Sequence, residues 1–141
     1  MSNSDNPRSR AETLRMLRNS LDEMSGSHVT LIGDIMLDRF HHGFANNLNS
    51  RAPVPVLKIF RTDESPGAAA HIARGLTSMG LDIDFYSFVG DDREGEIVKK
   101  MLSDDGISTD GIETIDDHNT LVKIRFYGSR ESLLDNPQIL L

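Results

Sequence analysis

Two segments limit how this chain can fold, because each joins an apolar element to polar groups. Residues 33–40 read Gly-Asp-Ile-Met-Leu-Asp-Arg-Phe, and they place Asp34 and Asp38 directly after an apolar strand at residues 28–32. Residues 66–75 read Pro-Gly-Ala-Ala-Ala-His-Ile-Ala-Arg-Gly, and they place a glycine turn before a helix of small residues. This layout is typical of a polar small-molecule site at the carboxyl end of a parallel sheet.

The rest of the pattern predicts an α/β domain with a parallel sheet. Residues 83–89 are apolar on both faces apart from Asp84 and Ser87, which is typical of a strand that helices cover on both sides. Residues 121–126 alternate between apolar and basic side chains, which predicts a one-sided strand. Helices are expected at residues 68–79 and after Asp92, each ended by a glycine.

Three segments are predicted to be irregular or peripheral. Residues 41–52 are rich in Gly, Asn and Ser without periodicity, so they are expected to form a loop or an irregular edge. Residues 54–60 are extended, but nearby prolines cannot donate ladder hydrogen bonds, which favours an edge strand or a flap. Residues 65–67 read Ser-Pro-Gly and are expected to form a turn.

The amino end is predicted to carry a disordered tail at residues 1–9 and an amphipathic helix at residues 10–26. Ser9 and Glu12 have the spacing of a capping box, in which each side chain accepts from the other residue's backbone amide. The helix itself is expected to end near residue 24, before Ser-Gly-Ser. Residues 27–141 form the remaining unit, with no internal repeat.

Composition excludes several classes of function. The net charge is −7, with 22 acidic against 15 basic residues, so a nucleic-acid partner is not expected. The chain has no cysteine, which excludes disulfides, thiolate catalysis and cysteine-ligated metals. No apolar run approaches the ~20 residues of a membrane span, and the first residues are unlike a signal peptide. We therefore expect a soluble cytoplasmic protein without a membrane partner.

Five blocks follow one another along the chain. The first is the segment at residues 33–40, and the third is Pro-Gly-Ala-Ala-Ala-His at residues 66–71. The others read Ala-Pro-Val-Pro-Val-Leu-Lys at residues 52–58, Gly-Asp-Asp-Arg-Glu-Gly at residues 90–95 and Thr-Leu-Val-Lys-Ile-Arg at residues 120–125. In this order the five blocks resemble the ribokinase-like (PfkB) carbohydrate kinases, most of all their heptose-7-phosphate kinase domains, and the third is similar to the family's Pro-Gly-Gly-Ala-Ala-Asn.

The resemblance implies a three-layer α/β/α parallel sheet with a β-sheet lid, of which this chain would be the amino-terminal half. Lid segments are expected near residues 41–65 and 118–130. A complete enzyme would use ATP and Mg²⁺, and lid strands would pair in a homodimer. The family's catalytic signature, Asp-Thr-x-Gly-Ala-Gly-Asp, is absent, so we expect no catalytic, cofactor-binding or metal-binding residue in this chain and no kinase activity from it alone.

The resemblance also implies that seven residues of this chain bind a sugar or a sugar phosphate. Two of them differ from the family pattern, because Ala68 replaces a glycine and His71 replaces a hydroxyl-binding asparagine. The seven expected binding residues are Asp34, Asp38, Gly67, Ala68, His71, Lys123 and Arg125.

Each of these residues also has an ordinary structural interpretation. Asp34 could cap a turn, Asp38 could pair with the adjacent Arg39, and His71 could be a surface histidine. Lys123 and Arg125 could be a solvated strand face that discourages aggregation, or two cations for a substrate phosphate.

Two classes of function follow. The first is the substrate-binding portion of an ATP-dependent sugar kinase acting on a sugar phosphate such as heptose 7-phosphate. The second is a non-catalytic sugar-binding or dimerisation module derived from that family. A dinucleotide-binding domain is disfavoured, because the first strand does not end in a glycine triad.

Overall fold

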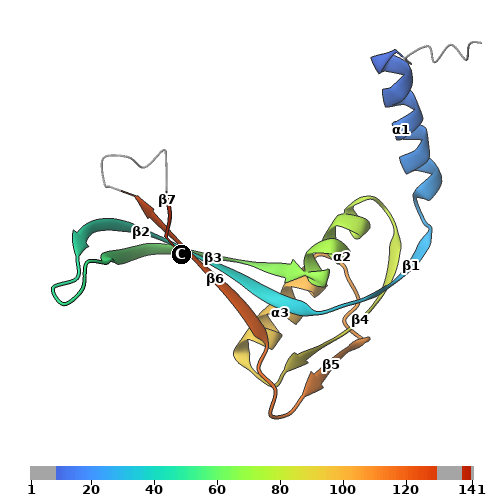
Figure 1. Ribbon diagram of the computed structural model, residues 1–141. Coiled ribbons are helices and arrows are strands. Elements are labelled where there is room, and N and C mark those ends of the chain that lie inside the picture. The colour runs from blue at the N-terminus through green and yellow to red at the C-terminus, as the bar shows by residue number, and fades with distance from the viewer. Residues whose placement is uncertain (1–8, 130–137, 141) are drawn as a thin grey trace, which may run out of the picture.

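The computed structural model describes residues 9–129 and 138–140, which form two sheets, with two helices packed against both of them and a third that projects away (Figure 1). The first sheet holds β1 (His28–Ile32), β4 (Asp82–Gly90) and β5 (Ile112–Ile115) in that order. All its strands are parallel. This confirms the α/β class and both predicted apolar strands.

The second sheet, here called the lid sheet, extends away from the first (Figure 1). Its order is β3 (Pro55–Ala68), β2 (Ile35–Leu48), β6 (Leu121–Ser129) and β7 (Gln138–Leu140). β2 is antiparallel to β3 and parallel to β6, and β7 is antiparallel to β6. β2 therefore lies between β3 and β6 and is the strand through which the lid sheet is continuous.

Two helices cover one face of the parallel sheet and also contact the base of the lid sheet. α2 (Ala69–Ser78) and α3 (Arg93–Asp104) both contact β2, β3 and β4. The core that they enclose is apolar, and its largest fully buried side chains are Leu37, Val89, Val98 and Leu102. The parallel sheet with α2 and α3 is called the α/β layer below.

The other face of the parallel sheet is uncovered within the described residues, contrary to the prediction for residues 83–89. Phe85 and Val89 are buried, but Tyr86 and Phe88 on the opposite face are 49% and 42% exposed. Ile32, which pairs with Tyr86, is 78% exposed. The described helices pack on one side of the sheet only. The apolar side chains on the other face of β4 are therefore not covered by described residues.

Residues 41–52 were expected to form a loop or an irregular edge, and the loop is wrong up to Leu48, because β2 continues to that residue. Pairing with β3 outweighs the weak strand propensity of these residues. The strand is irregular there, with register shifts between His42 and Gly43 and between Phe44 and Asn47. A Cβ at Gly43 would lie 2.6 Å from Cγ of Leu57, so only glycine permits this close approach of the two strands.

The turn predicted at residues 65–67 was also wrong, because these residues belong to β3. Ser65, Pro66 and Gly67 pair with Asp38, Leu37 and Met36. β3 is the edge strand of the lid sheet, where a proline is tolerated because its missing amide can face away from the ladder. This edge position agrees with the expectation for residues 54–60.

The amino-terminal helix α1 (Arg10–Met24) projects away from the α/β layer (Figure 1). Its predicted capping box is confirmed, since Ser9 N donates to Glu12 Oε2 at 2.9 Å and Glu12 N donates to Ser9 Oγ at 3.3 Å. No residue of α1 is buried, so its apolar stripe is not covered by any other described residue. None of the helices in the described ranges has the length and apolarity needed to cross a membrane.

Candidate functional site

Three charged side chains from β2 and β6 meet at Asp38 and are called the Asp38 cluster. Lys123 Nζ lies 2.8 Å from Asp38 Oδ1, and Arg125 Nη1 donates to the same oxygen at 3.0 Å. Asp38 pairs with Lys123 in the strand register, and side chains two residues apart share a face, so both cations lie on the face of Asp38. Two cations and one carboxylate leave one positive charge uncompensated.

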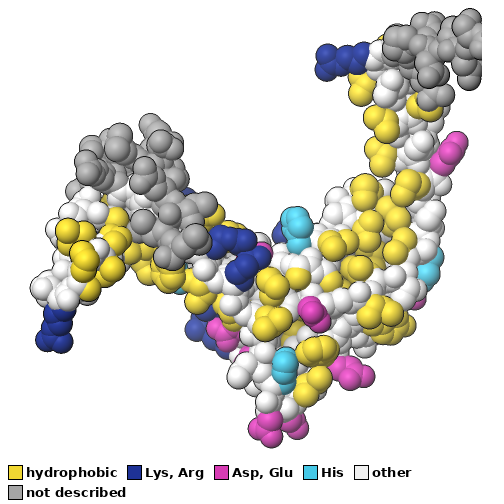
Figure 2. Space-filling model, viewed as in Figure 1, with side chains coloured by type: hydrophobic (Ala, Val, Ile, Leu, Met, Phe, Trp, Pro, Cys, Tyr) yellow, Lys and Arg dark blue, Asp and Glu magenta, His cyan; other side chains and the backbone are white. Residues whose placement is uncertain are grey.

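Basic side chains are visible together where the lid sheet leaves the α/β layer, beside the open hollow between the lid sheet and the rest of the protein (Figure 2). The Arg125 guanidinium also lies over the ring of Phe40, 5.3 Å from its centroid. This cation–π contact adds a second restraint to its position. The alternation predicted for residues 121–126 holds at its start, because Val122 packs against the core while Lys123 and Arg125 face Asp38. Ile124 and Phe126, expected on the same face as Val122, are 45% and 37% exposed, so the apolar face is not buried along the whole strand.

Gly67 borders the second oxygen of Asp38. A Cβ at this position would lie 2.6 Å from Asp38 Oδ2 and 2.8 Å from Met36 Cγ, so a larger residue would displace the carboxylate. Among the described residues, Oδ2 accepts no hydrogen bond, and the Asp38 side chain is only 15% exposed. The geometry therefore leaves one carboxylate oxygen as an acceptor for a hydroxyl group.

Asp34 and His71 are not joined to the Asp38 cluster by any hydrogen bond or ion pair of the described residues. Both side chains are exposed, and the backbone oxygen of Asp34 accepts from Ala69 N at 3.0 Å. His71 lies on α2 and borders an open depression of about 630 Å³ together with Arg74 and Asp105. The structure thus brings Asp38, Gly67, Lys123 and Arg125 together, and it places Asp34 and His71 apart from them.

Ala68 joins β3 to α2 in a backbone conformation that favours glycine. Its φ is +52° and its ψ is −128°, which is close to the first central position of a type II′ turn. A residue with a Cβ is strained there. Alanine in place of the family's glycine therefore strains the backbone at this position and lowers the stability of the fold.

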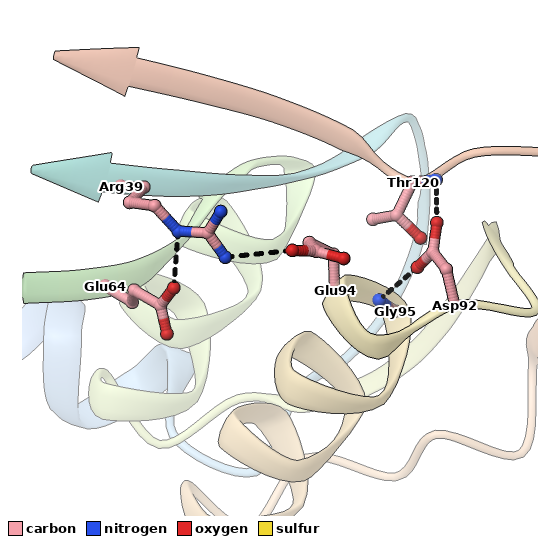
Figure 3. A network of polar contacts seen from close by, with 6 residues as sticks. All are labelled: Arg39, Glu64, Asp92, Glu94, Gly95 and Thr120. Atoms are coloured by element: carbon pink, nitrogen blue, oxygen red, sulfur yellow. Dashed lines mark hydrogen bonds and ion pairs between the residues drawn. The ribbon is translucent and has the colours of Figure 1, made fainter.

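Sequence reasoning missed a polar network at the first turn of α3, which we call the α3 junction (Figure 3). Arg39 Nε donates to Glu64 Oε1 at 2.6 Å, and its Nη2 donates to Glu94 Oε1 at 3.0 Å. Arg39 does not pair with Asp38, because consecutive strand residues face opposite sides. The alternative interpretation of Asp38 as the partner of Arg39 was therefore wrong.

The other half of the α3 junction is built on Asp92, the N-cap of α3. Its Oδ1 accepts from Gly95 N at 2.7 Å, and its Oδ2 accepts from Thr120 N at 2.7 Å. Thr120 is buried, and its Oγ1 accepts from Gly90 N at 3.0 Å. The glycines of the block at residues 90–95 were a usable signal, because a Cβ at Gly95 would lie 2.9 Å from Thr120 Oγ1.

Two pKa values in the α3 junction are shifted. Burial of Asp92 would by itself raise the pKa of its carboxyl group, but the amides of Thr120 and Gly95 outweigh burial and hold that pKa below its usual range. The pKa of Arg39 is raised, first by its hydrogen bond to Glu64 and then by the one to Glu94. Both groups are therefore charged at neutral pH.

The pattern of these residues agrees with a comparison against protein families. The pfkB family carbohydrate kinase model matches residues 27–138. The chain belongs to this family.

Two curated proteins are similar to this chain over most of its length. The bifunctional protein HldE of Magnetococcus marinus is 36% identical over 107 residues, covering 76% of this chain and 22% of the relative. The D-beta-D-heptose 7-phosphate kinase of Bordetella bronchiseptica is 31% identical over 113 residues, covering 80% of this chain and 36% of the relative. The chain thus corresponds to between about a fifth and somewhat over a third of the length of these two relatives.

Solved structures show the same ribokinase-like fold. The ribokinase of Cryptococcus neoformans in complex with ADP has a TM-score of 0.55 at 21% identity, and the match covers 82% of this chain and 34% of that ribokinase. The Arabidopsis thaliana ribokinase complexed with ribose and ATP has a TM-score of 0.56 at 14% identity, and the match covers 83% of this chain and 36% of that ribokinase.

Replacing Ala68 by glycine is expected to stabilise the PfkB domain. Relief of the positive φ outweighs the extra freedom of glycine in the unfolded chain, so the free energy of unfolding should rise by about 1 kcal/mol. Urea unfolding monitored by circular dichroism measures this change. The matched substitution Ala70→Gly, inside α2, should lower the free energy of unfolding by at least about 1 kcal/mol. A decrease in stability in Ala68→Gly would contradict the strain argument.

The Asp92→Asn variant is expected to be less stable by about 1 kcal/mol at pH 7, because the amide group cannot accept from both Gly95 and Thr120. The folded pKa of Asp92 lies below the unfolded one, so its stabilisation is complete above the unfolded pKa and disappears as the pH falls through the folded pKa. The stability difference between the wild type and Asp92→Asn should therefore shrink below about pH 4. Urea unfolding between pH 7 and pH 3 tests this, and a difference that stays constant over the whole range would refute it.

Proposed function

We propose that this chain is the substrate-binding portion of an ATP-dependent sugar kinase that phosphorylates a sugar phosphate such as heptose 7-phosphate. The observation that carries the proposal is the Asp38 cluster, in which a mostly buried carboxylate keeps one oxygen free beside two cations. A carboxylate oxygen accepts from sugar hydroxyls, and the cations suit a phosphate. The similarity to the D-beta-D-heptose 7-phosphate kinase of Bordetella bronchiseptica supports the same substrate class.

The charge of the Asp38 cluster supports a phosphorylated rather than a neutral sugar. Lys123 and Arg125 share one carboxylate oxygen, so an incoming phosphate meets a net positive charge although the whole chain is acidic. Their side chains are 43% and 33% exposed, so both cations are accessible. In this proposal Asp38 binds a hydroxyl, Lys123 and Arg125 bind the phosphate, and Gly67 provides the space. Asp34, Ala68 and His71 border the sugar from the junction of the lid sheet with the α/β layer.

We infer that the residues of this chain do not by themselves hold ATP with Mg²⁺. Within the described ranges no three acidic or histidine side chains group as a metal site, and the sequence has no glycine-rich phosphate loop. We therefore propose that the nucleotide site and the catalytic base of the enzyme lie outside this sequence. Phosphorylation of heptose 7-phosphate by the isolated chain would overturn that view.

A second candidate function, a dimerisation module, is favoured by exposed apolar side chains on the distal half of the lid sheet. Phe60 is 54% exposed and Leu48 is 70% exposed, and Val54, Val56 and Ile59 are also exposed. Such a patch is typical of a surface that another protein covers. We propose that a second copy of the chain covers it, so that two lid sheets pair.

Calorimetric titration with heptose 7-phosphate is expected to show binding, and titration with ATP–Mg²⁺ is expected to show none. Lys123→Met should weaken heptose 7-phosphate binding by about tenfold, because the variant cannot make a charge-assisted hydrogen bond to the phosphate. The same variant should bind the unphosphorylated heptose as the wild type does. Lys58→Met, which removes an exposed lysine elsewhere in the lid sheet, is the matched control and should bind normally.

Equal weakening for the phosphorylated and the unphosphorylated heptose in Lys123→Met would contradict the assignment of Lys123 to the phosphate. Asp38→Asn should weaken both ligands, because the hydroxyl acceptor is changed and the two cations are left without their shared partner. Absence of heptose binding by the wild type would favour the dimerisation module.

The dimer prediction is tested by sedimentation velocity over a range of concentrations. The wild type is expected to sediment as a dimer, and Phe60→Asp is expected to shift it toward the monomer, because a charge is placed in the apolar patch. Asp110→Asn, at an exposed site in the α/β layer, should not change the distribution. A wild type that stays monomeric at every concentration would exclude pairing through the lid sheet.

A further inference from the structure

We propose that Arg39 is a positioning residue for the sugar site, which holds the lid sheet on the first turn of α3 and so sets where the Asp38 cluster lies relative to the α/β layer. This proposal rests on the proposed function, because the cluster is taken to bind the sugar. Arg39 lies on the face of β2 opposite to Asp38, so it acts through the strand and not by contact with the substrate.

The contacts of Arg39 join the two parts of the protein. Glu64 lies directly across from Arg39 on β3, so their hydrogen bond is internal to the lid sheet. Glu94 lies in the first turn of α3, so the second hydrogen bond crosses from the lid sheet to the α/β layer. Figure 3 shows the guanidinium group between the two carboxylates. One side chain therefore connects β2, β3 and α3.

Partial burial makes these hydrogen bonds stronger than an exposed ion pair. The side chains of Arg39, Glu64 and Glu94 are 20%, 25% and 27% exposed, whereas the Arg61–Asp63 pair of the same sheet is 59% and 49% exposed. Charge-assisted hydrogen bonds gain strength as water is excluded. Without Arg39 the Glu64 and Glu94 carboxylates would repel each other, so its removal would drive β3 and α3 apart.

A second hydrogen bond at the first turn of α3 restrains the lid sheet at another point. Asp92 holds the Thr120 amide at the entry to β6, which is the strand that carries Lys123 and Arg125. β2 pairs with β6. The first turn of α3 thus fixes the lid sheet at two points, at Thr120 and at Arg39. In a variant without the Arg39 side chain, the first turn of α3 keeps only its hydrogen bond to Thr120, and the rest of the attachment is the packing of β2 and β3 against α2 and α3. The lid sheet then loses its polar restraint on the side of β3 and can tilt relative to the α/β layer.

The position of the lid sheet matters because the proposed sugar site is divided. Asp38, Lys123 and Arg125 belong to the lid sheet, whereas His71 belongs to α2 in the α/β layer and Asp34 lies between β1 and β2, where its backbone oxygen accepts from Ala69 N of α2. A rotation of the lid sheet would separate the two groups, and a misplacement of about 1 Å can lower the efficiency of a binding or catalytic site by up to about a hundredfold. The core residue Leu37, which is fully buried, takes no part in the hydrogen bonds of Arg39, so the fold should persist.

The experiment measures the position of the lid sheet directly and sugar binding separately. The chain has no cysteine, so a thiol-reactive spin label attaches only to cysteines that are introduced. We choose Asn47→Cys in the lid sheet and Ser103→Cys in α3, because both positions are exposed. Pulsed electron resonance on labelled protein diluted with an excess of the unlabelled, cysteine-free chain then gives the distance distribution between the two labels of one chain. Arg39→Met is expected to broaden or shift this distribution and to weaken heptose 7-phosphate binding by at least about tenfold.

Two further variants separate positioning from a general disruption of the structure. Arg39→Lys keeps the charge between the carboxylates, so it should restore the distribution and the binding at least in part. Arg61→Met removes an arginine from the same sheet without a contact to α3, and it should leave both measurements unchanged. If circular dichroism shows that Arg39→Met does not fold, Glu94→Gln replaces it, because that variant leaves the Arg39–Glu64 bond in place.

An unchanged distance distribution in the folded Arg39→Met or Glu94→Gln variant overturns the proposal, whether or not sugar binds. A broadened distribution with wild-type sugar affinity also overturns it, because the position of the lid sheet would then not matter to the site. If the unsubstituted chain binds no heptose 7-phosphate, the proposed function fails, and with it the role of Arg39 in sugar binding, while the distance measurement still decides whether Arg39 holds the lid sheet.

Discussion

The structure depends on the alternation of side chains along β2. Leu37 is fully buried in the core, and Asp38, the next residue, faces the opposite side and binds Lys123 and Arg125. Arg39 then returns to the face of the α/β layer and binds Glu94. Because a strand places consecutive side chains on opposite faces, the burial of Leu37 fixes the direction of both charged neighbours. A shift of one residue in register would exchange the core residue with the site residue.

The charges of the lid sheet are arranged so that each face has a different role. On one face, two cations share one oxygen of Asp38, so the three side chains together carry one net positive charge. On the other, one cation lies between two carboxylates, and all three partners are partly shielded from water. The first arrangement is open to an anion, whereas the second is satisfied internally. The same strand can therefore serve binding on one side and attachment on the other.

The elements that the sequence predicted well are those whose pattern is local. The capping box of Ser9 and the alternation at the start of β6 follow from spacing alone. The errors lie where pairing partners distant in sequence decide the outcome. Residues 65–67 have turn chemistry, but their pairing with β2 makes them a strand, and the missing amide of Pro66 is tolerated at the sheet edge. Residues 41–48 lack periodicity, yet β3 holds them in a strand with two register shifts.

The sequence by itself determined the α/β class, the order of the elements and the charged residues available to a site, because periodicity and residue chemistry are local properties. Only the tertiary structure decided which of those residues meet. It brought Gly67, Lys123 and Arg125 to Asp38 and left Asp34 and His71 apart from them. It also made Glu64 and Glu94 the hydrogen-bond partners of Arg39. Arg39 and Glu94 are separated by 55 residues, and a hydrogen bond over that separation depends on how the sheets and helices pack, which no local pattern specifies.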